Sequence, residues 1–163
     1  TYPMSSSSIK ILNYSFPVLI IQIILGVWLS SNYASLACPD FPLCQGQIIP
    51  EADFKMGFNF LQSIGPDYLG GQLDHEARLA IHIVHRYGAL AVTAYFFILI
   101  FTFIRENQYR FAKILAGLLF LQIVLGISNI IYSLPLYVAI AHNLGALLLL
   151  ISISYFRLKV SGR

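Results

Sequence analysis

Two long stretches of the chain contain no charged side chain, and they constrain the fold more than any other feature. One stretch lies between Lys10 and Asp40, and the other lies between Lys113 and Arg157. A helix rises about 1.5 Å per residue and needs roughly 20 apolar residues to cross the hydrocarbon of a membrane. The second stretch is therefore long enough for two crossings, with Pro135 at the turn between them. Charged residues make up only 10% of the chain, whereas soluble domains carry about 25%, which argues against a soluble fold.

A third apolar run, residues 77–104, has His82, His85 and Arg86 in its first half. Together the runs predict an all-α integral membrane protein, a bundle of four transmembrane helices that forms a single domain over residues 1–163. The expected helices are residues 11–31, 77–104, 111–132 and 137–156.

The charged residues predict the orientation of this bundle, because basic residues stay on the cytoplasmic side of a membrane. Seven of the ten Lys and Arg residues lie before the first helix, in the turn 105–113 or in the C-terminal tail. Six of the seven acidic residues lie in the long loop of about residues 32–76. We therefore expect both termini to be cytoplasmic and the long loop to be extracytoplasmic. The net charge of +3 then reflects topology, so membrane lipid is an expected partner and nucleic acid is not.

An internal repeat predicts that the bundle is a duplicated helical hairpin. The pattern Q-I-x-L-G occurs at residues 22–26 and again at residues 122–126, and the pattern H-x-x-G-A-L occurs at residues 85–90 and again at residues 142–147. Each repeated histidine lies five to eight residues beyond the expected start of its helix, which corresponds to a depth of roughly 8 to 12 Å. The two imidazoles should therefore lie at similar depth on two helices.

His85 and His142 are the expected iron ligands of a haem, because imidazole binds iron well and a helical bundle can hold a haem between two inward-facing side chains. Gly88 and Gly145 each follow a histidine by three residues, on the same helix face, and are expected to leave room for the flat macrocycle. The alternative is that the histidines are hydrogen-bonded interior residues and that the glycines only let helices pack closely.

Two neighbours of His85 are further candidates for binding the cofactor. Arg86 could pair with a haem propionate, or it could extend to the lipid headgroups. His82 lies one turn before His85 and could act as a hydrogen-bond donor to the ligand, a proton relay, an alternative ligand or a plain interfacial histidine. His75, among the acids of the loop, is expected to be solvated.

Cys38 and Cys44 are the only cysteines, and an extracytoplasmic position favours a disulfide between them. Such a ring could hold the loop in place or act as a redox relay, and its spacing is not the C-x-x-C of thioredoxin-type proteins. Residues 53–64 have Phe54, Phe58 and Leu61 at helical spacing and are expected to form a short amphipathic helix on the membrane surface. Residues 65–71 are turn-forming.

Five segments of the sequence together resemble the haem A synthases of bacterial respiratory chains. They are residues 32–34, 36–47, 65–73, 81–86 and 141–147. The resemblance implies a multi-pass protein of the bacterial inner membrane that oxidises a methyl group of haem O to the formyl group of haem A, for cytochrome oxidase biogenesis. The oxidation proceeds by successive hydroxylations, with water as the expected source of oxygen.

Members of that family usually have eight transmembrane helices in two similar halves, and this chain resembles the second half. The chain has no basic stretch or cleavage site before its first helix, so no cleavable signal peptide is expected. Two alternatives stay open by the resemblance: the chain is half of an eight-helix protein, or it is a four-helix member that acts as a homodimer. The expected partners are a second four-helix half or a homo-oligomer, the substrate haem O and the product haem A, and haem O synthase.

By the same resemblance, His85 and His142 would be the axial bis-histidine ligands of a haem b, and Cys38 and Cys44 would be the external cysteine pair. The first half of the family carries a Glu three residues before its own histidine, and that Glu is implicated in the reaction. This chain has His82 at the matching position. We therefore expect it to be an electron-transferring half of the enzyme, and no catalytic residue is assigned.

Two other functions remain open from the residues. A non-catalytic b-type cytochrome that carries electrons would need only the histidine pair, but it leaves the cysteine loop unexplained. A quinone-linked membrane thiol oxidase would use external cysteines, but the absence of C-x-x-C counts against it.

Overall fold

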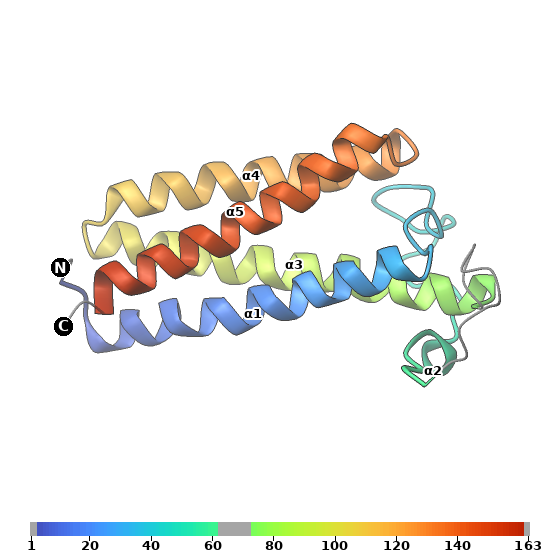
Figure 1. Ribbon diagram of the computed structural model, residues 1–163, viewed down its shortest axis with the longest axis horizontal. Coiled ribbons are helices and arrows are strands. Elements are labelled where there is room, and N and C mark those ends of the chain that lie inside the picture. The colour runs from blue at the N-terminus through green and yellow to red at the C-terminus, as the bar shows by residue number, and fades with distance from the viewer. Residues whose placement is uncertain (1–2, 62–72, 162–163) are drawn as a thin grey trace.

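The computed structural model describes residues 3–61 and 73–161, and within them the chain is built from helices and loops without a strand (Figure 1). The helices are α1 (Ser6–Ser31), α2 (Phe54–Gly57), α3 (His75–Arg105), α4 (Tyr109–Ile131) and α5 (Leu136–Ser161). All except α2 are long and apolar enough to cross a membrane. The chain is therefore an integral membrane protein with four candidate spans among its described residues.

The four long helices form a bundle in which α3 and α5 are diagonal to each other. Helix α3 packs against α1 and α4, and α5 packs against the same two helices. The Cα atoms of α3 and α5 stay more than 8 Å apart throughout the described residues. Figure 1 shows both chain ends at one end of the bundle, here called the termini end, whereas the segment between α1 and α3 lies at the opposite loop end.

Caps extend the helices beyond the expected bounds by a few residues. Helix α1 starts at Ser6 rather than at residue 11, because the Ser5 side chain accepts a hydrogen bond from the Ser8 amide and so caps the first turn. Asp74 caps α3 in the same way by accepting from the amide of Ala77 at 3.0 Å. The predicted turn at Pro135 is present between α4 and α5.

The buried core of the bundle lies towards the termini end. Phe103 of α3, Phe111 of α4 and Phe156 of α5 form its aromatic part, with Phe111 and Phe156 stacked at 4.4 Å between ring centroids. Towards the loop end the second hairpin is more open, because Gly145 is the only fully buried residue between Phe120 and Leu148. The loop-end half of the second hairpin, which contains His142, thus has few buried side chains of its own.

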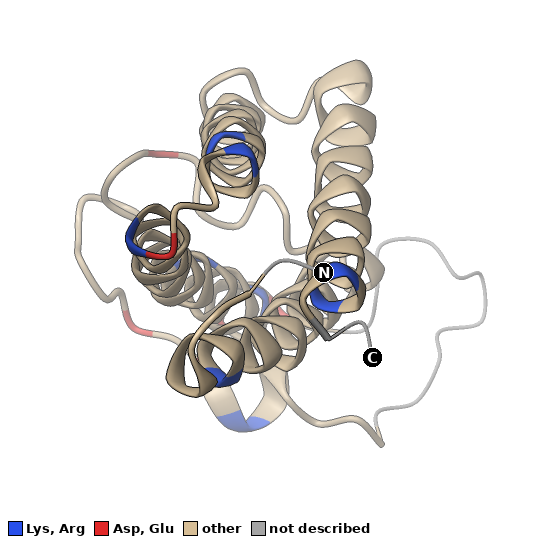
Figure 2. Cartoon of the chain, turned by 90° about the vertical axis from the view of Figure 1, so that its left-hand side faces the viewer, with Lys and Arg blue, Asp and Glu red and all other residues tan. Residues whose placement is uncertain are grey.

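Basic residues gather at the termini end, and one acid there ties α1 to the turn between α3 and α4. Figure 2 looks at this end and shows Lys and Arg at the near ends of the long helices. Glu106 accepts hydrogen bonds from the hydroxyls of Ser8 and Ser5. The bond from Ser8, followed by that from Ser5, holds the pKa of Glu106 below its usual value. The ionised carboxylate therefore links the start of α1 to the end of α3.

The expected amphipathic helix over residues 53–64 is wrong in its length. Helix α2 ends at Gly57, where the backbone approaches α3 so closely that an added Cβ would lie 2.6 Å from the carbonyl oxygen of Ala77. The indole of Trp28 donates to the Gly57 carbonyl at 2.9 Å and fixes this approach. Residues 62–64 and the turn-forming residues 65–71 lie outside the described residues.

We predict that Gly57→Ala separates α2 from α3, because the new methyl group would meet backbone rather than a movable side chain. Overpacking of this kind costs about 1 to 3 kcal/mol. Trp28 is the only tryptophan, so thermal unfolding in detergent followed by its fluorescence measures the change directly.

The matched control is Gly117→Ala in α4, where an added Cβ meets nothing within 4 Å. That variant should be neutral or slightly more stable, because alanine favours a helix over glycine by up to about 1 kcal/mol. Equal melting curves for the two variants would contradict the close packing at Gly57.

Candidate functional site

The two repeated histidines lie on the diagonal pair of helices, in the half of the bundle nearer the loop end. His85 lies ten residues after the start of α3, and His142 lies six residues after the start of α5. Both side chains are partly buried, and both lie in the loop-end half of their helices. The fold therefore brings together two imidazoles from sequence positions that are far apart.

Gln22 of α1 contacts both the backbone and the ring of His85. Its amide nitrogen Nε2 donates to the His85 carbonyl oxygen at 3.0 Å and lies 3.2 Å from the ring nitrogen Nδ1. Its oxygen Oε1 occupies the space in front of Gly88, where an added Cβ would come within contact distance of that oxygen. This Oε1 is buried and has no hydrogen-bond partner.

Gln122 of α4 makes the same backbone contact in the second hairpin. Its Nε2 donates to the His142 carbonyl oxygen at 3.0 Å, and its Oε1 occupies the space in front of Gly145 and is buried without a partner. The ring of His142 differs from that of His85, because its Nδ1 is buried and has no hydrogen-bond partner. The two histidines thus have equivalent backbone contacts and different ring contacts.

The structure gives Gly88 and Gly145 a different role from the expected one. The space beside these glycines is filled by the glutamine side chains and is not left for a macrocycle. Gly26 and Gly126 are the glycines that face the rings, since a Cβ on either would lie 3.2 Å from the imidazole Cε1 of His85 or His142. The sequence contained a signal for these glutamines and glycines, because Q-I-x-L-G is repeated as strictly as the histidine pattern.

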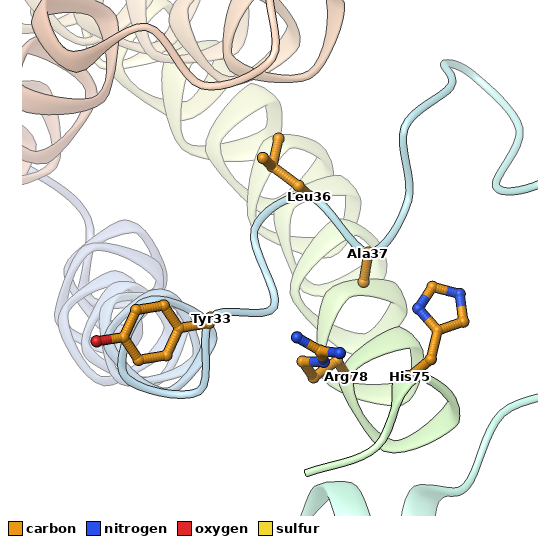
Figure 3. A pocket seen from close by; sticks show the side chains of 5 residues that line it. All are labelled: Tyr33, Leu36, Ala37, His75 and Arg78. Carbon is orange, nitrogen blue, oxygen red and sulfur yellow. The ribbon is translucent and has the colours of Figure 1, made fainter. Parts of the chain in front are cut away.

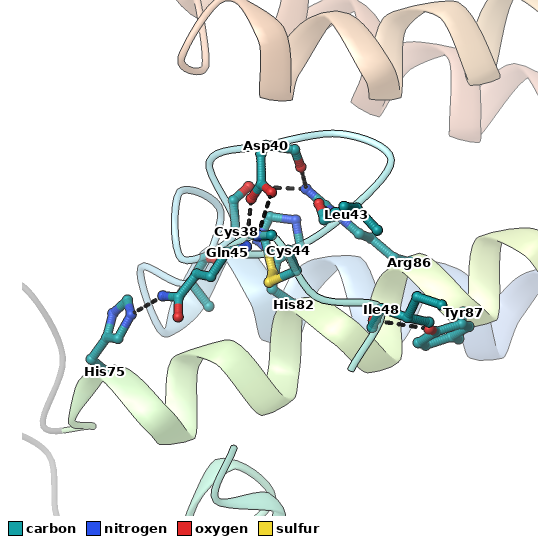
Figure 4. Close-up of a disulfide and its surroundings, with 12 residues drawn as sticks. Cys38, Asp40, Leu43, Cys44, Gln45, Ile48, His75, His82, Arg86 and Tyr87 are labelled. Carbon is teal, nitrogen blue, oxygen red and sulfur yellow. Dashed lines mark hydrogen bonds between the residues drawn. A yellow bond between two sulfur atoms is a disulfide. The ribbon is translucent and has the colours of Figure 1, made fainter. Parts of the chain in front are cut away.

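Arg86 holds the cysteine loop against α3 (Figure 4). Its Nη1 donates to the carbonyl of Leu43 at 2.8 Å, and its Nη2 donates to the carbonyls of Cys38 and Asp40 at 2.9 and 2.8 Å. The guanidinium therefore points into the loop rather than towards lipid headgroups. Because Arg86 follows His85 directly, the same turn of α3 carries both the candidate ligand and the attachment of the loop.

His82 and His75 also contact the segments between α1 and α3. His82 is only 3% exposed, and its Nδ1 lies 2.9 Å from the carbonyl oxygen of Ala34, just after α1. His75 is the first residue of α3 and is exposed, with its Nε2 2.6 Å from the side-chain amide of Gln45. His82 therefore joins two parts of the backbone, and its Nδ1 is occupied by that contact.

The cysteine loop is a compact ring closed by a disulfide between Cys38 and Cys44. The carboxylate of Asp40 accepts hydrogen bonds from the backbone amides of Gln45 at 2.6 Å and Gly46 at 2.9 Å. The bond from Gly46, followed by that from Gln45, holds the pKa of Asp40 below its usual value, and the positive charge of Arg86 adds to this effect. The folded ring therefore favours the ionised form of Asp40.

A small pocket of about 140 Å³ lies beside this loop, lined in part by Tyr33, His75 and Arg78 (Figure 3). It is far smaller than the 300–1,000 Å³ or so of a usual organic-ligand site. It also lies on the loop side of α3 and does not contain either of the repeated histidines. We therefore do not assign the cofactor to it.

The residues around His85 and His142 fit a haem as the bound group. Two imidazoles from diagonal helices supply ligands of the type that haem iron takes. Within the described residues there is no cluster of three or more His, Cys, Asp or Glu side chains able to hold a metal ion. A haem would itself supply the remaining ligands of its iron.

Comparison with known proteins agrees with this description. Residues 3–154 match the family described as cytochrome oxidase assembly protein. The chain is 43% identical over 143 residues to the haem A synthase of Shewanella oneidensis, covering 85% of this chain and 43% of that protein. The haem A synthases of Wolbachia pipientis wMel and Flavobacterium johnsoniae are 32% and 27% identical, over 85% and 90% of this chain and 36% and 41% of their own lengths. The chain therefore spans less than half the length of these relatives, and no solved structure matches it significantly.

We predict that acid loosens the cysteine loop through Asp40. Because the pKa of Asp40 is depressed in the folded loop, its stabilising contribution is complete above the usual value of 3.8 and is lost as the pH falls through the lower, folded value. Hydrogen exchange of the Gln45 and Gly46 amides, corrected for intrinsic rates, should show protection that decreases over that pH range.

In Asp40→Asn the same amides should already exchange faster at neutral pH, with a weaker dependence on pH. Glu51→Gln, which removes an exposed carboxylate of the same loop, is the control and should behave as the unchanged protein. Identical exchange in Asp40→Asn and Glu51→Gln would show that Asp40 does not hold the ring.

Proposed function

Because the chain belongs to the family of cytochrome oxidase assembly proteins, we propose that it is the haem-binding, electron-transferring half of a haem A synthase. The observation that carries this proposal is the placement of His85 and His142 on diagonal helices, each held by a glutamine of its own hairpin. Their rings would be the axial ligands of a haem b. Histidines that hold a haem from both sides would suit it to electron transfer rather than to direct attack on a substrate.

The proposed reaction is the oxidation of a methyl group of haem O to the formyl group of haem A. A methyl group and one water give a formyl group, four electrons and four protons, so the enzyme must remove electrons as well as add oxygen. A bound haem b would supply one-electron transfer. The residues of this chain would hold that haem, exclude water from it through the cysteine loop and orient its two ligands.

The substrate is proposed to bind in another four-helix half, supplied by the same protein or by a second copy. The relatives are more than twice as long as the matched region, which leaves room for a further bundle of this size. His82 supports this division into a haem-binding half and a substrate-binding half. It occupies the position at which the first half of the family carries the Glu implicated in the reaction, and its Nδ1 already contacts the carbonyl oxygen of Ala34. Haem O synthase is a proposed partner for delivery of the substrate.

We also propose that the protein lies in a bacterial inner membrane with its termini end in the cytoplasm. The basic residues gathered at that end support this orientation, and an oxidising compartment at the loop end suits the disulfide.

The matched contacts of Gln22 with His85 and of Gln122 with His142 support an origin of the two hairpins by duplication.

Arg86 and the disulfide are proposed to keep the cysteine loop closed over the haem site. The three carbonyls that Arg86 binds surround the disulfide. A propionate could still approach the buried Nε of Arg86, which has no partner, and it would then share the guanidinium with the loop.

The ligand assignment predicts that His85→Ala or His142→Ala removes the low-spin spectrum of a bis-imidazole haem, because one axial position is emptied. Absorption and pyridine haemochrome spectra of purified protein measure both the spin state and the type of haem. His75→Ala is the control, because His75 is exposed at the start of α3, and it should leave the spectrum unchanged.

His82→Ala separates this assignment from its closest alternative. His82 lies one turn from His85, so a spectrum that is lost in His82→Ala and kept in His85→Ala would move the ligand by one turn. Spectra unaffected by His85→Ala and by His142→Ala would mean that both residues are interior histidines without an iron.

A verified monomer of this chain is predicted to bind haem b but to form no haem A from haem O, because the substrate half is missing. The measurement is chromatography of haems extracted after incubation with haem O and an electron acceptor. Activity should appear when a four-helix half that carries the family Glu is joined to the chain. Haem A formed by the monomer alone would contradict the division of roles.

A further inference from the structure

We infer that Asn129 of α4 is a positioning residue for His142, whose Nδ1–H would donate to the side-chain oxygen of Asn129 and leave Nε2 free for iron. The inference deepens the proposed function and rests on it for the role of the iron. Asn129 lies three residues beyond the repeated Q-I-x-L-G and belongs to neither repeated pattern. An amide within an apolar span is costly unless it has a partner, so its presence there needs an explanation.

Asn129 lies on the face of α4 that is turned to α5. Gln122, Gly126 and Asn129 follow one another at spacings of four and three residues, which places them on one side of the helix. The first two contact α5 directly, since Gln122 donates to the His142 carbonyl and a Cβ on Gly126 would lie 3.2 Å from the His142 ring. The carbonyl of Asn129 accepts from the amide of Leu134 at 2.7 Å, so the turn before α5 fixes its backbone.

The ring of His142 has its Nδ1 on the side of α4. Measured from the Cβ that would be added at Gly126, Cε1 lies at 3.2 Å, Nδ1 at 3.7 Å and Nε2 at 4.0 Å. Side chains on a helix lean towards its N-terminus, so the His142 ring leans towards the loop end, where α5 starts. The Asn129 side chain leans the other way, back towards Gly126. The two side chains therefore lean towards each other from facing helices.

Each of the two side chains contains a buried atom that lacks a hydrogen-bond partner among the described residues, and the two atoms are complementary. They are Nδ1 of His142 and Oδ1 of Asn129. A neutral histidine that binds a metal through Nε2 has its proton on Nδ1, and that N–H typically donates to a carboxylate, a carbonyl or water. The side-chain oxygen of Asn129 is an acceptor of this kind. A hydrogen bond between the two atoms, absent from the structure, would satisfy both.

Gln122 has the other buried acceptor of this hairpin without a partner in the described part of the chain, but that atom lies on the wrong side of the ring. Its Oε1 occupies the space in front of Gly145. Gly145 lies one turn after His142, towards the termini end, whereas the ring leans towards the loop end. Asn129 is therefore the acceptor that the ring can reach.

The first hairpin has an apolar residue at the equivalent position. Counted from the repeated Q-I-x-L-G, Asn129 corresponds to Leu29. Leu29 packs against an apolar cluster that includes Ile81, four residues before His85. By the repeat, Asn129 should likewise lie one turn on the loop side of its own histidine. The amide is thus particular to the hairpin of His142, and the two haem ligands are inequivalent.

The experiment compares Asn129→Leu with Asn129→Asp in the full chain loaded with haem. A hydrogen bond from Nδ1–H raises the basicity of the ligating imidazole, which favours ferric iron. Asn129→Leu removes the acceptor, so it should raise the midpoint reduction potential and lower haem affinity by about 10-fold or more. Asn129→Asp supplies a stronger acceptor with an oxygen at both ends of the terminal group, so it should lower the potential. A purely structural role would not shift the potential in opposite directions.

Asn143→Leu is the matched control, because it makes the same change at an amide that directly follows His142 but is exposed. It should leave the potential and the low-spin electron paramagnetic resonance signal as they are in the unchanged protein.

Nitrogen-15 NMR of labelled histidines tests the same contact without iron. In the full chain free of haem, the chemical shifts distinguish a proton on Nδ1 from a proton on Nε2. His142 should carry its proton on Nδ1 in the unchanged protein. In Asn129→Leu the population with the proton on Nε2 should increase, because Nδ1–H has lost its acceptor.

The possible results separate this inference from the proposed function. If the unchanged chain binds low-spin haem and neither variant of Asn129 changes its potential, the inference is wrong and the proposed function stands. A shift in Gln122→Met without one in Asn129→Leu would also refute it, because Gln122 would then be the acceptor. If the unchanged chain binds no haem, the proposed function fails and the NMR result decides. A proton on Nδ1 that moves in Asn129→Leu supports the contact, and a proton on Nε2 in both proteins refutes it.

Discussion

Hydrocarbon offers no hydrogen-bond partner, so polar side chains within the spans depend on partners inside the protein, and the arrangement of this bundle follows from that constraint. Helices satisfy their own backbones, and this leaves the few polar side chains of the apolar runs to be paired across helices. Gln22 and Gln122 meet the need through the carbonyls of His85 and His142. Each of these bonds joins the two helices of one hairpin at the level of a histidine, and it thereby sets the position of that histidine relative to the neighbouring helix.

The two ends of the molecule are stabilised in different ways, and the difference defines where a cofactor can be held. At the termini end, Phe103, Phe111 and Phe156 fill the space between three helices with packed aromatic rings. At the loop end, the segment after α1 folds down on α3 and is attached there by Arg86 and His82. Between these two regions the bundle has fewer buried side chains, and both imidazoles lie in that part.

The sequence predicted the features that depend on the period and length of apolar runs. The four long helices, the turn at Pro135 and the long connection after α1 are of this kind, because hydrocarbon thickness sets helix length directly. It could not predict where α2 ends, since that depends on the close approach of Gly57 to the backbone of Ala77. Such an approach is a tertiary contact between distant residues, and it leaves no periodic signal.

In the candidate site, too, the features that follow from the sequence repeat could be predicted, whereas the contacts between helices could not. The histidine pair could be predicted because its pattern occurs twice, but the filling of the space beside Gly88 by Gln22 could not, since a repeat does not say which residues face each other. Arg86 was expected to bind an anion or to reach the headgroups, and in the structure its guanidinium binds three carbonyls of the cysteine loop. The loop that supplies these carbonyls folds back over α3, and the amino-acid composition does not predict this contact.

Helices α1 and α4 both run towards the loop end, and α3 and α5 both run back (Figure 1). Two hairpins with the same direction are related by rotation about an axis along the membrane normal, whereas units of opposite direction would need an axis in the membrane plane. Rotation about the normal leaves depth unchanged, and Gln22 and Gln122 lie equally far from the loop ends of their helices. Under the proposed duplication, such a rotation would set how deep the site lies, and side-chain packing would set how far apart its two sides are.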